Sequence, residues 1–401
     1  MSCIVQKYGG SSVADVEKLK MIARRIAEVK SRGTDVAVVV SAMGKTTDNL
    51  VGLVASISDR PPRREMDMLL STGERITMAL LCMALHEQGL EAVSLTGSQA
   101  GIITNHRHND ARVIEVRPFR VQDELAAGRV VIVGGFQGVS YKRDITTLGR
   151  GGSDTTAVAL AAALDAQRCE IYSDVDGVYS ADPSVVDQAR HLPEVSYEAM
   201  QEMSATGAKV LNAQAVQFAK EKKIAIYARS TFDPGRETVI RKLPPGAIAG
   251  VQAVVSEKAI TRVRLYGDNL VSRFREAARL LENEQVPIKE VSLAADREKG
   301  KASFVVSLAN IYGWESIRSR LTDIAGPDLH LDTELGALSL IGEGLNSDNT
   351  TLLSVLELLD QAGIAVAGVT TTSFRISLLV PIGKVLEAVR ACHEHWIKPS
   401  P

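Results

Sequence analysis

The chain has 401 residues, 45% hydrophobic and 23% charged, which is enough for about two or three globular domains with buried cores. Its formal net charge of -2 and its 4% aromatic content give no case for nucleic acid or an anionic membrane as a partner. Its four cysteines are far apart and form no C-x-x-C pair, which favours reduced thiols in a cytoplasmic protein. We expect no secretory signal at the N-terminus and no apolar run long enough to cross a membrane.

The first elements follow a strand, turn, helix order. Residues 3–7 predict a strand, residues 8–12 a loop, and residues 13–30 an amphipathic helix. Residues 35–40 form a continuous apolar run, as expected of a strand buried on both faces. The Gly44-Lys45-Thr46 sequence that follows is not a P-loop, because the earlier glycine of that motif would fall on Val39.

The same order recurs further along the chain. Helical residues 76–87 follow the turn at 70–75, and apolar strands at 130–133 and 169–172 each end in a glycine- or aspartate-rich turn. Repeated strand-to-helix alternation predicts a mainly parallel sheet with helices on both faces. Ligands of such sheets bind at the carboxyl ends of the strands.

The stretch Thr146–Thr156 has the strongest local signal. Three glycines precede the helix-forming run 157–164, and Ser153 or Asp154 can cap that helix. A glycine turn that leads into a helix N-terminus favours an anion, and Arg150 adds a planar donor for carboxylate or phosphate. The alternative is an ordinary capped turn.

Two polar loops have an open interpretation. Asp174, Asp176 and Asp182 are candidates for a divalent cation or for simple turn formation, and their spacing excludes an EF-hand. His106 and His108 have no third ligand nearby in the sequence, so we expect a solvated loop there.

A breaker cluster at 243–246 predicts a domain boundary, and beyond it one order of elements occurs twice. Each repeat reads strand, helix, strand, strand, helix, over 260–322 and then 337–395. The second repeat has no closing strand of its own, and residues 250–256 are a candidate for that strand.

Six segments together resemble the aspartate kinases (aspartokinases). They are Lys7–Val13, Ser41–Asp48, Ser71–Arg75, Gln99–Ile102, Gly149–Thr155 and Asp174–Pro183. The resemblance implies an α/β protein: a three-layer α/β/α amino-acid kinase domain with a mainly parallel sheet, followed by two α+β ACT-type (βαββαβ) domains. The implied boundaries are 1–242 for the kinase domain, 243–258 for a linker that supplies the possible strand, 259–332 for the first ACT domain and 333–401 for the second.

The resemblance also implies the reaction and its residues. ATP would phosphorylate the β-carboxylate of L-aspartate to 4-phospho-L-aspartate, the first step towards lysine, threonine and methionine, with Mg²⁺ held mainly by the ATP phosphates and no certain protein ligand. The implied catalytic residues are Lys7, Asp154 and Lys209. The implied substrate-binding residues are Ser41, Thr47, Glu74, Arg150 and Ser153. The implied ATP-binding residues are Lys7, Tyr8, Gly9, Gly10, Gly151, Gly152, Ser173, Asp174, Tyr179, Ser180, Ala181, Asp182, Pro183 and Lys209.

The sequence departs from the family pattern after Lys209 and in the effector loops of both ACT-type repeats. Asn212-Ala213-Gln214 replaces the usual His-Pro-Arg after Lys209, and Asp268-Asn269 replaces the usual Pro-Gly of the first ACT domain. The resemblance implies a homodimer or higher homo-oligomer through the ACT domains. Because of these departures we expect altered or weak feedback by lysine or threonine. Two alternatives stay open: a kinase of another amino-acid carboxylate, and a non-catalytic amino-acid sensor subunit.

Overall fold

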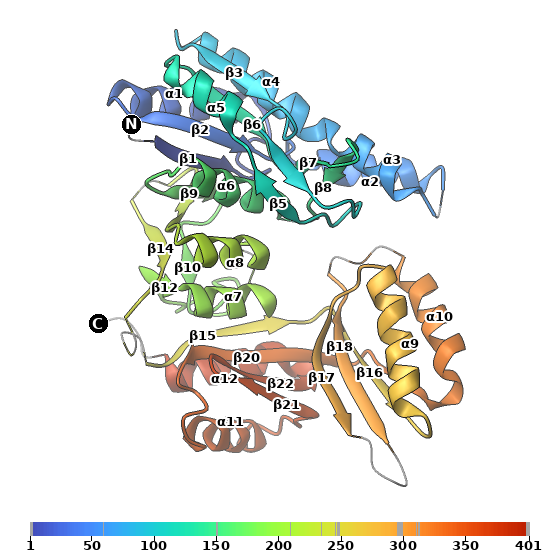
Figure 1. Cartoon of the computed structure of the whole chain (residues 1–401). Helices are drawn as coiled ribbons and strands as arrows, with labels where there is room; N and C mark the ends of the chain where they lie inside the picture. The colour runs from blue at the N-terminus through green and yellow to red at the C-terminus, as the bar shows by residue number, and fades with distance from the viewer. Residues whose placement is uncertain are drawn as a thin grey trace. The chain divides into compact units, whose positions relative to one another are not determined.

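The protein is represented by a computed structural model that describes residues 3–58, 60–149, 151–208, 210–233, 235–244, 246, 249–294, 300–309, 311 and 313–397. The chain divides into two compact units. The first comprises Met1–Val178, His191–Ala205 and Lys209–Pro244, and the second comprises Tyr179–Arg190, Thr206–Ala208 and Pro245–Pro401. Figure 1 shows the elements of both units.

The first unit contains the elements that bear the predicted kinase motifs. They are β1 (Cys3–Tyr8), α1 (Val16–Ser31), β2 (Asp35–Val40), α2 (Thr46–Ala55), α3 (Arg63–Leu70), α4 (Thr72–His86), β3 (Ala92–Leu95), β4 (Ile102–Thr104), β5 (Val113–Val116), α5 (Phe119–Ala126), β6 (Val130–Gly134), β7 (Gln137–Ser140), β8 (Ile145–Thr147), α6 (Gly152–Ala163), β9 (Cys169–Ser173), β11 (His191–Leu192), β12 (Glu194–Ser196), α7 (Tyr197–Ala205), α8 (Ala213–Lys222), β13 (Ile226–Ser230) and β14 (Glu237–Arg241). The two-residue strand β10 (Val178–Tyr179) pairs with β11.

A mainly parallel sheet forms the centre of this unit, with the order β12-β14-β13-β9-β1-β2-β6-β3. Strands β13, β9, β1, β2, β6 and β3 run parallel to their neighbours in this series, and β14 is antiparallel to β13. Residues Val36–Val40 of β2 are all fully buried, because helices cover both faces of the sheet. The predicted α/β class is thereby confirmed.

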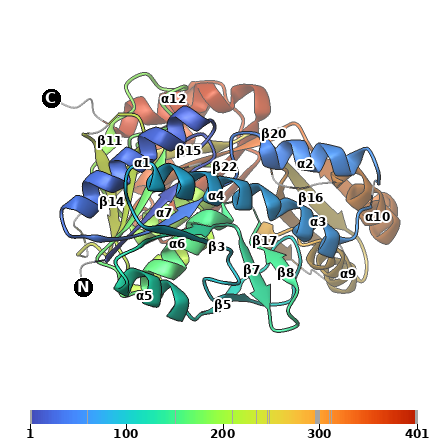
Figure 2. The same cartoon turned by 90° about the horizontal axis from the view of Figure 1, so that it is seen from above.

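Helices α1 and α4 pack together on one face of the sheet and share a cluster with alternate strand residues such as Val38 and Ile132. Figure 2 shows these two helices side by side. Helix α6 contacts β1 and β2, and its residues Gly152–Ala161 are all buried. Its small alanine side chains allow the helix to lie close to the strands, so the glycine turn before it reaches the sheet edge.

The helical run Arg63–His86, formed by α3 and α4, bears on the expectation that no apolar run is long enough to cross a membrane. By length and mean hydropathy it is apolar enough to cross a membrane, and half of its most apolar window is buried inside the protein, as in a core helix. The run includes the buried carboxylates of Asp67 and Glu74, which face polar partners within the fold. Packing in the first unit buries Leu70, Met78, Leu81 and Leu85, whereas Met68, Ile76 and Met83 are exposed.

The second unit consists of two similar α+β halves. Their elements are β15 (Gly250–Glu257), β16 (Ile260–Tyr266), α9 (Leu270–Asn283), β17 (Ile288–Ala294), β18 (Lys301–Ser307), α10 (Trp314–Ala325), β19 (Leu329–Asp332), β20 (Leu335–Glu343), α11 (Thr350–Gln361), β21 (Gly368–Thr372), β22 (Arg375–Pro381) and α12 (Val385–Trp396). The sheet orders are β17-β18-β16-β19 and β15-β20-β22-β21.

The fourth strand of each small sheet has a different place in the chain: it follows the other elements in the first half and precedes them in the second. In the first half β19, which follows the second helix, lies antiparallel to β16. In the second half β15, which precedes the whole repeat, lies antiparallel to β20. The segment after the 243–246 breaker cluster thus occupies in the second sheet the place that β19 occupies in the first.

Candidate active site

Four parallel strands of the large sheet end at the same edge. The pairings Tyr8 with Val40, Tyr8 with Tyr172 and Val40 with Gly134 align the carboxyl ends of β1, β2, β9 and β6. Lys7 therefore lies at the edge at which the polar turns after β2, β6 and β9 also begin. This is where a parallel α/β sheet binds ligands.

A buried ion pair lies at this edge. Lys7 Nζ is 2.7 Å from Asp154 Oδ1, and the two side chains are only 11% and 9% exposed. The second carboxylate oxygen of Asp154 accepts a hydrogen bond of 3.3 Å from the Asn212 backbone N–H. Because water screens buried charges poorly, the lysine is a strong local cation held in one position.

The glycine turn before α6 is held by backbone geometry. Gly151 has φ of 72° and is the N-terminal cap residue of α6, with no side-chain cap, so the expected capping by Ser153 or Asp154 is wrong. Both residues instead lie in the first helical turn and are buried. A Cβ on Gly151 would lie 2.7 Å from the Asn212 side chain, so only glycine fits there.

The first glycine loop is packed as closely. A Cβ on Gly10 would lie 3.0 Å from the Ala42 carbonyl oxygen, and a Cβ on Gly9 would lie 3.5 Å from Lys7 Nζ. The Gly9 N–H donates to the Tyr172 carbonyl at 3.0 Å. Glycine therefore leaves the face of the lysine uncovered, while the Gly9 N–H already has a partner inside the protein.

Glu74 lies in the first turn of α4 and is 3% exposed. Its Oε1 accepts from the Ala42 N–H at 3.1 Å, and among the described residues its buried Oε2 has no hydrogen-bond partner. Burial raises the pKa of this carboxyl group to about 7, only partly offset by its backbone hydrogen bonds. A buried carboxylate oxygen without a partner is suited to an incoming ammonium group.

The other expected substrate residues surround the same edge. Ser41 follows β2 and its N–H donates to the Tyr8 carbonyl at 3.1 Å. Thr47 is half-buried in the first turn of α2. The Ser153 hydroxyl would lie 2.8 Å from a Cβ on Gly135, which brings α6 against the turn after β6. Arg150 and Lys209 lie outside the described residues.

The turns after β9 hold the expected nucleotide residues. Asp174 is exposed and Ser173 is half-buried, whereas Ser180 and Ala181 are buried. The Asp182 carboxylate accepts from Ser184 N and Ser184 Oγ at 2.9 and 2.7 Å. Across the described residues, no group of three or more His, Cys, Asp or Glu side chains is placed to hold a metal ion.

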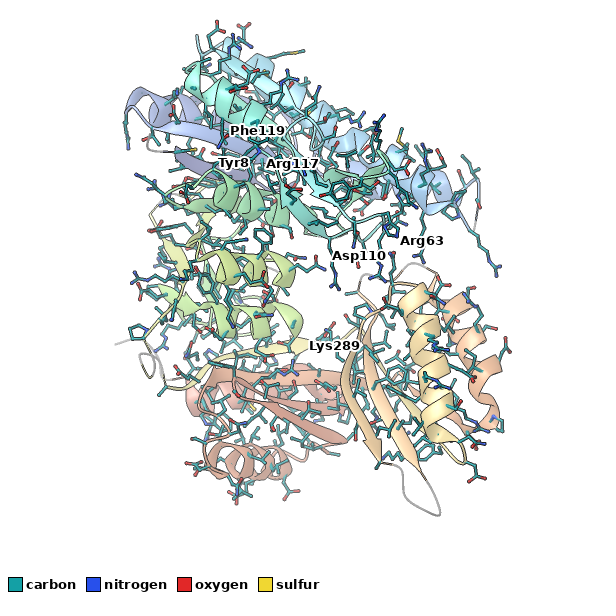
Figure 3. All side chains as sticks on the ribbon, viewed as in Figure 1. Tyr8, Arg63, Asp110, Arg117, Phe119 and Lys289 are labelled. Atoms are coloured by element: carbon teal, nitrogen blue, oxygen red, sulfur yellow. The ribbon has the colours of Figure 1, made fainter. Side chains whose placement is uncertain are left out.

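The histidine loop differs in part from the expected solvated loop, because His106 is exposed whereas His108 contacts a buried carboxylate. His108 Nδ1 lies 2.7 Å from Asp67 Oδ2, and Asp67 is fully buried on α3. The same carboxylate accepts from Thr147 Oγ1 at 2.5 Å and from the Asn109 N–H at 3.0 Å. Figure 3 labels Arg63 on this helix and Asp110 in the loop that contacts it.

This carboxylate joins α3 and the 105–112 loop to the end of β8, directly before the glycine turn. Sequence reasoning missed Asp67, although a carboxylate within the apolar run 66–70 was a usable signal. It identified Asn212 only as a departure from the family pattern and did not predict that its side chain caps α8, by accepting from Gln214 N and Ala215 N, and lies against Gly151.

Residues 2–230 match the model of a family described as the amino acid kinase family. An aspartokinase of Mycolicibacterium smegmatis is 43% identical over 406 residues, covering 98% of this chain and 96% of the relative. An aspartokinase of Geobacillus stearothermophilus is 41% identical over 400 residues, covering 98% and 97%.

Solved structures agree with this fold. E. coli aspartokinase III in complex with aspartate and ADP superposes with a TM-score of 0.84 at 22% identity, covering 99% of this chain and all of that one. Aspartate kinase from Synechocystis superposes with a TM-score of 0.56 at 34% identity, covering 99% of this chain and 70% of that one.

Proposed function

Because the chain belongs to the aspartokinases of the amino acid kinase family, we propose that it transfers the γ-phosphoryl group of ATP to the β-carboxylate of L-aspartate. A bond forms between a β-carboxylate oxygen and the γ-phosphorus, and the bond from that phosphorus to the β,γ-bridging oxygen breaks. ADP leaves with the electron pair, and the products are ADP and 4-phospho-L-aspartate. The observation that carries the proposal is the buried Lys7–Asp154 ion pair at the carboxyl edge of the sheet.

The residues around that ion pair have separate roles in phosphoryl transfer. Phosphoryl transfer depends mainly on positioning and charge stabilisation, and the Lys7 ammonium group neutralises charge on the transferred phosphoryl group. Asp154 holds Lys7 in place, and Lys209 contributes a second cation at the phosphates. The backbone of Gly10 and Gly151 lies close to the ligand because neither residue has a side chain in the way. Bound Mg²⁺ supplies further charge neutralisation at the ATP phosphates.

The amino-acid substrate is held at both α-groups. The free Oε2 of Glu74 pairs with the α-ammonium group, and Arg150 pairs with the α-carboxylate as a planar donor. Ser41, Thr47 and Ser153 complete the pocket. Replacing Arg150 with alanine is expected to raise KM for aspartate strongly, and an unchanged KM would place the carboxylate contact elsewhere.

The second unit provides assembly and effector binding. We assign 1–242 to catalysis, 243–258 to the linker with the completing strand, and 259–332 and 333–401 to two ACT domains that form a homodimer or higher homo-oligomer. A solved E. coli aspartokinase III contains lysine together with aspartate.

Feedback by lysine or threonine is altered or weak in this chain. Asn269, in place of the usual Pro-Gly, is the cap residue before α9; it has a left-handed conformation and makes no side-chain cap. Strong inhibition by either amino acid below millimolar concentration would contradict this.

An acyl-phosphate trap tests the reaction and its acceptor. The protein is incubated with MgATP, hydroxylamine and one amino acid from a panel, and hydroxamate is measured. Signal with L-aspartate alone supports the proposal. Signal with a different amino acid would indicate a kinase of another carboxylate, and no signal with any amino acid would indicate a sensor subunit.

A further inference from the structure

The segment Tyr179–Arg190 contains part of the expected nucleotide site, yet it packs within the second unit. Ser180 is its first anchor. The Ser180 N–H donates to the Arg190 carbonyl at 2.8 Å, and the Ser180 carbonyl accepts from the Val254 N–H at 2.7 Å. The Ser180 hydroxyl accepts from the Arg190 N–H at 2.8 Å and lies 2.8 Å from Nε2 of His393 on α12.

Ser180 and His393 are both buried: Ser180 is 0% exposed and His393 is 4% exposed. Because the serine oxygen already accepts a backbone N–H, its own proton is free to be donated to Nε2 of a neutral imidazole. Burial, and next the positive charge of Arg190, lower the pKa of His393 and favour that neutral ring. Removing either side chain would leave a buried polar group without its partner.

Helix α12 holds the same segment at a second point. Arg390 Nε donates to the Val185 carbonyl at 3.0 Å. Arg390 precedes His393 by three residues, so both side chains project from one face of the helix. Ala181 and Val186 of the same segment belong to the apolar cluster that includes Cys392 of this helix. The segment is therefore attached to the last helix along most of its length.

These contacts with α12 limit which groups of the segment are available to contact a nucleotide. The hydroxyl of Ser180 is already engaged by His393 and the Arg190 backbone, and it faces the protein interior. The exposed residue Asp182 follows two positions later in a turn closed by the Val185 N–H to Asp182 carbonyl bond of 2.9 Å. The turn is thus held on one side by Ser180, which contacts His393, and on the other by the Arg390 bond to Val185.

We propose that His393 is a positioning residue for ATP: through Ser180 it holds the backbone of Tyr179–Pro183 where the nucleotide binds. The proposal rests on the proposed kinase function. It gives the C-terminal helix an indirect effect on nucleotide affinity, through Ser180 and separate from the residues that contact the transferred phosphoryl group.

The test is a steady-state comparison in the full-length protein. His393→Ala and Ser180→Ala are each expected to raise KM for MgATP about five- to twenty-fold, as expected for a lost buried hydrogen bond. KM for aspartate is expected to stay within about two-fold, because Glu74 and the glycine turns are unchanged. Ser180→Ala also removes the acceptor of the Arg190 N–H, so the double variant is expected to match Ser180→Ala, with no further rise from His393→Ala.

Matched variants separate positioning from simple loss of folding. His393→Gln keeps a polar group near the Nε2 position and Ser180→Thr keeps the hydroxyl, so both are expected to restore KM for MgATP. His395→Ala, an exposed histidine on the same helix, is expected to change neither KM. A lower Tm in His393→Ala with an unchanged KM for MgATP, or an equal rise in both KM values, would overturn the proposal. Absence of wild-type hydroxamate would instead refute the kinase function.

Discussion

Lys7 Nζ and Asp154 Oδ1 form a 2.7 Å ion pair in which neither side chain is more than 11% exposed. Lys7 is delivered by β1 and Asp154 by the first turn of α6, so the pair connects the centre of the sheet to the glycine turn. The carboxylate keeps the ammonium group directed toward the open edge, and the lysine keeps a buried carboxylate from being uncompensated.

Lys7→Ala is expected to lower kcat by two to three orders of magnitude, about the loss seen when one preorganised charge partner of a transition state is removed. KM for aspartate is expected to change little, because the proposed role of Lys7 is at the phosphoryl group. Lys20→Ala is the control, since that lysine is exposed on α1. An unchanged kcat in Lys7→Ala would remove Lys7 from the mechanism.

Glu74→Gln tests the ammonium contact and predicts a pH dependence. In the wild type, Glu74 must be ionised to pair with the substrate, so KM for aspartate is expected to rise as pH falls below about 7. In the variant, KM is expected to be high throughout and this pH dependence to be lost. Glu87→Gln, an exposed position at the end of α4, is the matched control. A wild-type KM in Glu74→Gln would exclude the contact.

The same group has a stability signature with a defined sign. Its folded pKa is raised above the unfolded value, so its contribution is present below pH 4.5 and is lost as pH rises through about 7. Replacement by glutamine is therefore expected to increase the free energy of unfolding at pH 8 by up to about 3 kcal/mol and to leave it unchanged at pH 4. Denaturant unfolding at the two pH values measures the difference, and a loss of stability at pH 8 would contradict the argument.

Gly151→Ala tests the glycine turn against a matched control. Gly151 and Gly33 both have positive φ, 72° and 79°, but only the Cβ on Gly151 meets another group, the Asn212 side chain at 2.7 Å. Each alanine is expected to cost about 1 kcal/mol from backbone strain. Gly151→Ala should in addition raise KM for MgATP, whereas Gly33→Ala should retain wild-type kinetics. Equal kinetics in the two variants would show that the turn does not need its close packing.

Asp67→Asn removes the carboxylate shared by His108, Thr147 and Asn109. We expect a loss of about 2–3 kcal/mol in the free energy of unfolding, the cost of a buried hydrogen bond to a charged group. KM for aspartate should also rise, because the strand end at Thr147 leads into the glycine turn. Asp123→Asn on the exposed face of α5 is the control. If only stability changes, Asp67 has no role in positioning the turn.

Local patterns predicted the parts of the fold that depend on neighbouring residues. The apolar run 35–40 indicated a strand buried on both faces, and alternating strands and helices indicated the parallel sheet, as found. The predicted N-terminal cap of α6 was wrong. Gly151 adopts a left-handed conformation and is the cap residue, so the helix begins at Gly152, before Ser153 and Asp154.

Side-chain pairs between distant residues could not be predicted in this way. Ser180 and His393 are 213 residues apart, and Asp67 and His108 are 41 residues apart. Neither pair produces a periodic pattern, because each depends on how whole elements pack. The polar residues at the strand ends were recognisable only because several such ends meet at one edge of the sheet.

The proposed reaction makes the β-carboxylate of L-aspartate the acceptor of the γ-phosphoryl group of ATP. It is tested most directly with aspartate labelled with ¹⁸O in the β-carboxylate alone, MgATP and hydroxylamine. Hydroxylamine attacks the acyl carbon and releases phosphate together with the bridging oxygen of the substrate. We expect inorganic phosphate that carries one ¹⁸O atom, in an amount equal to the hydroxamate. Unlabelled phosphate, or none that depends on aspartate, would contradict it.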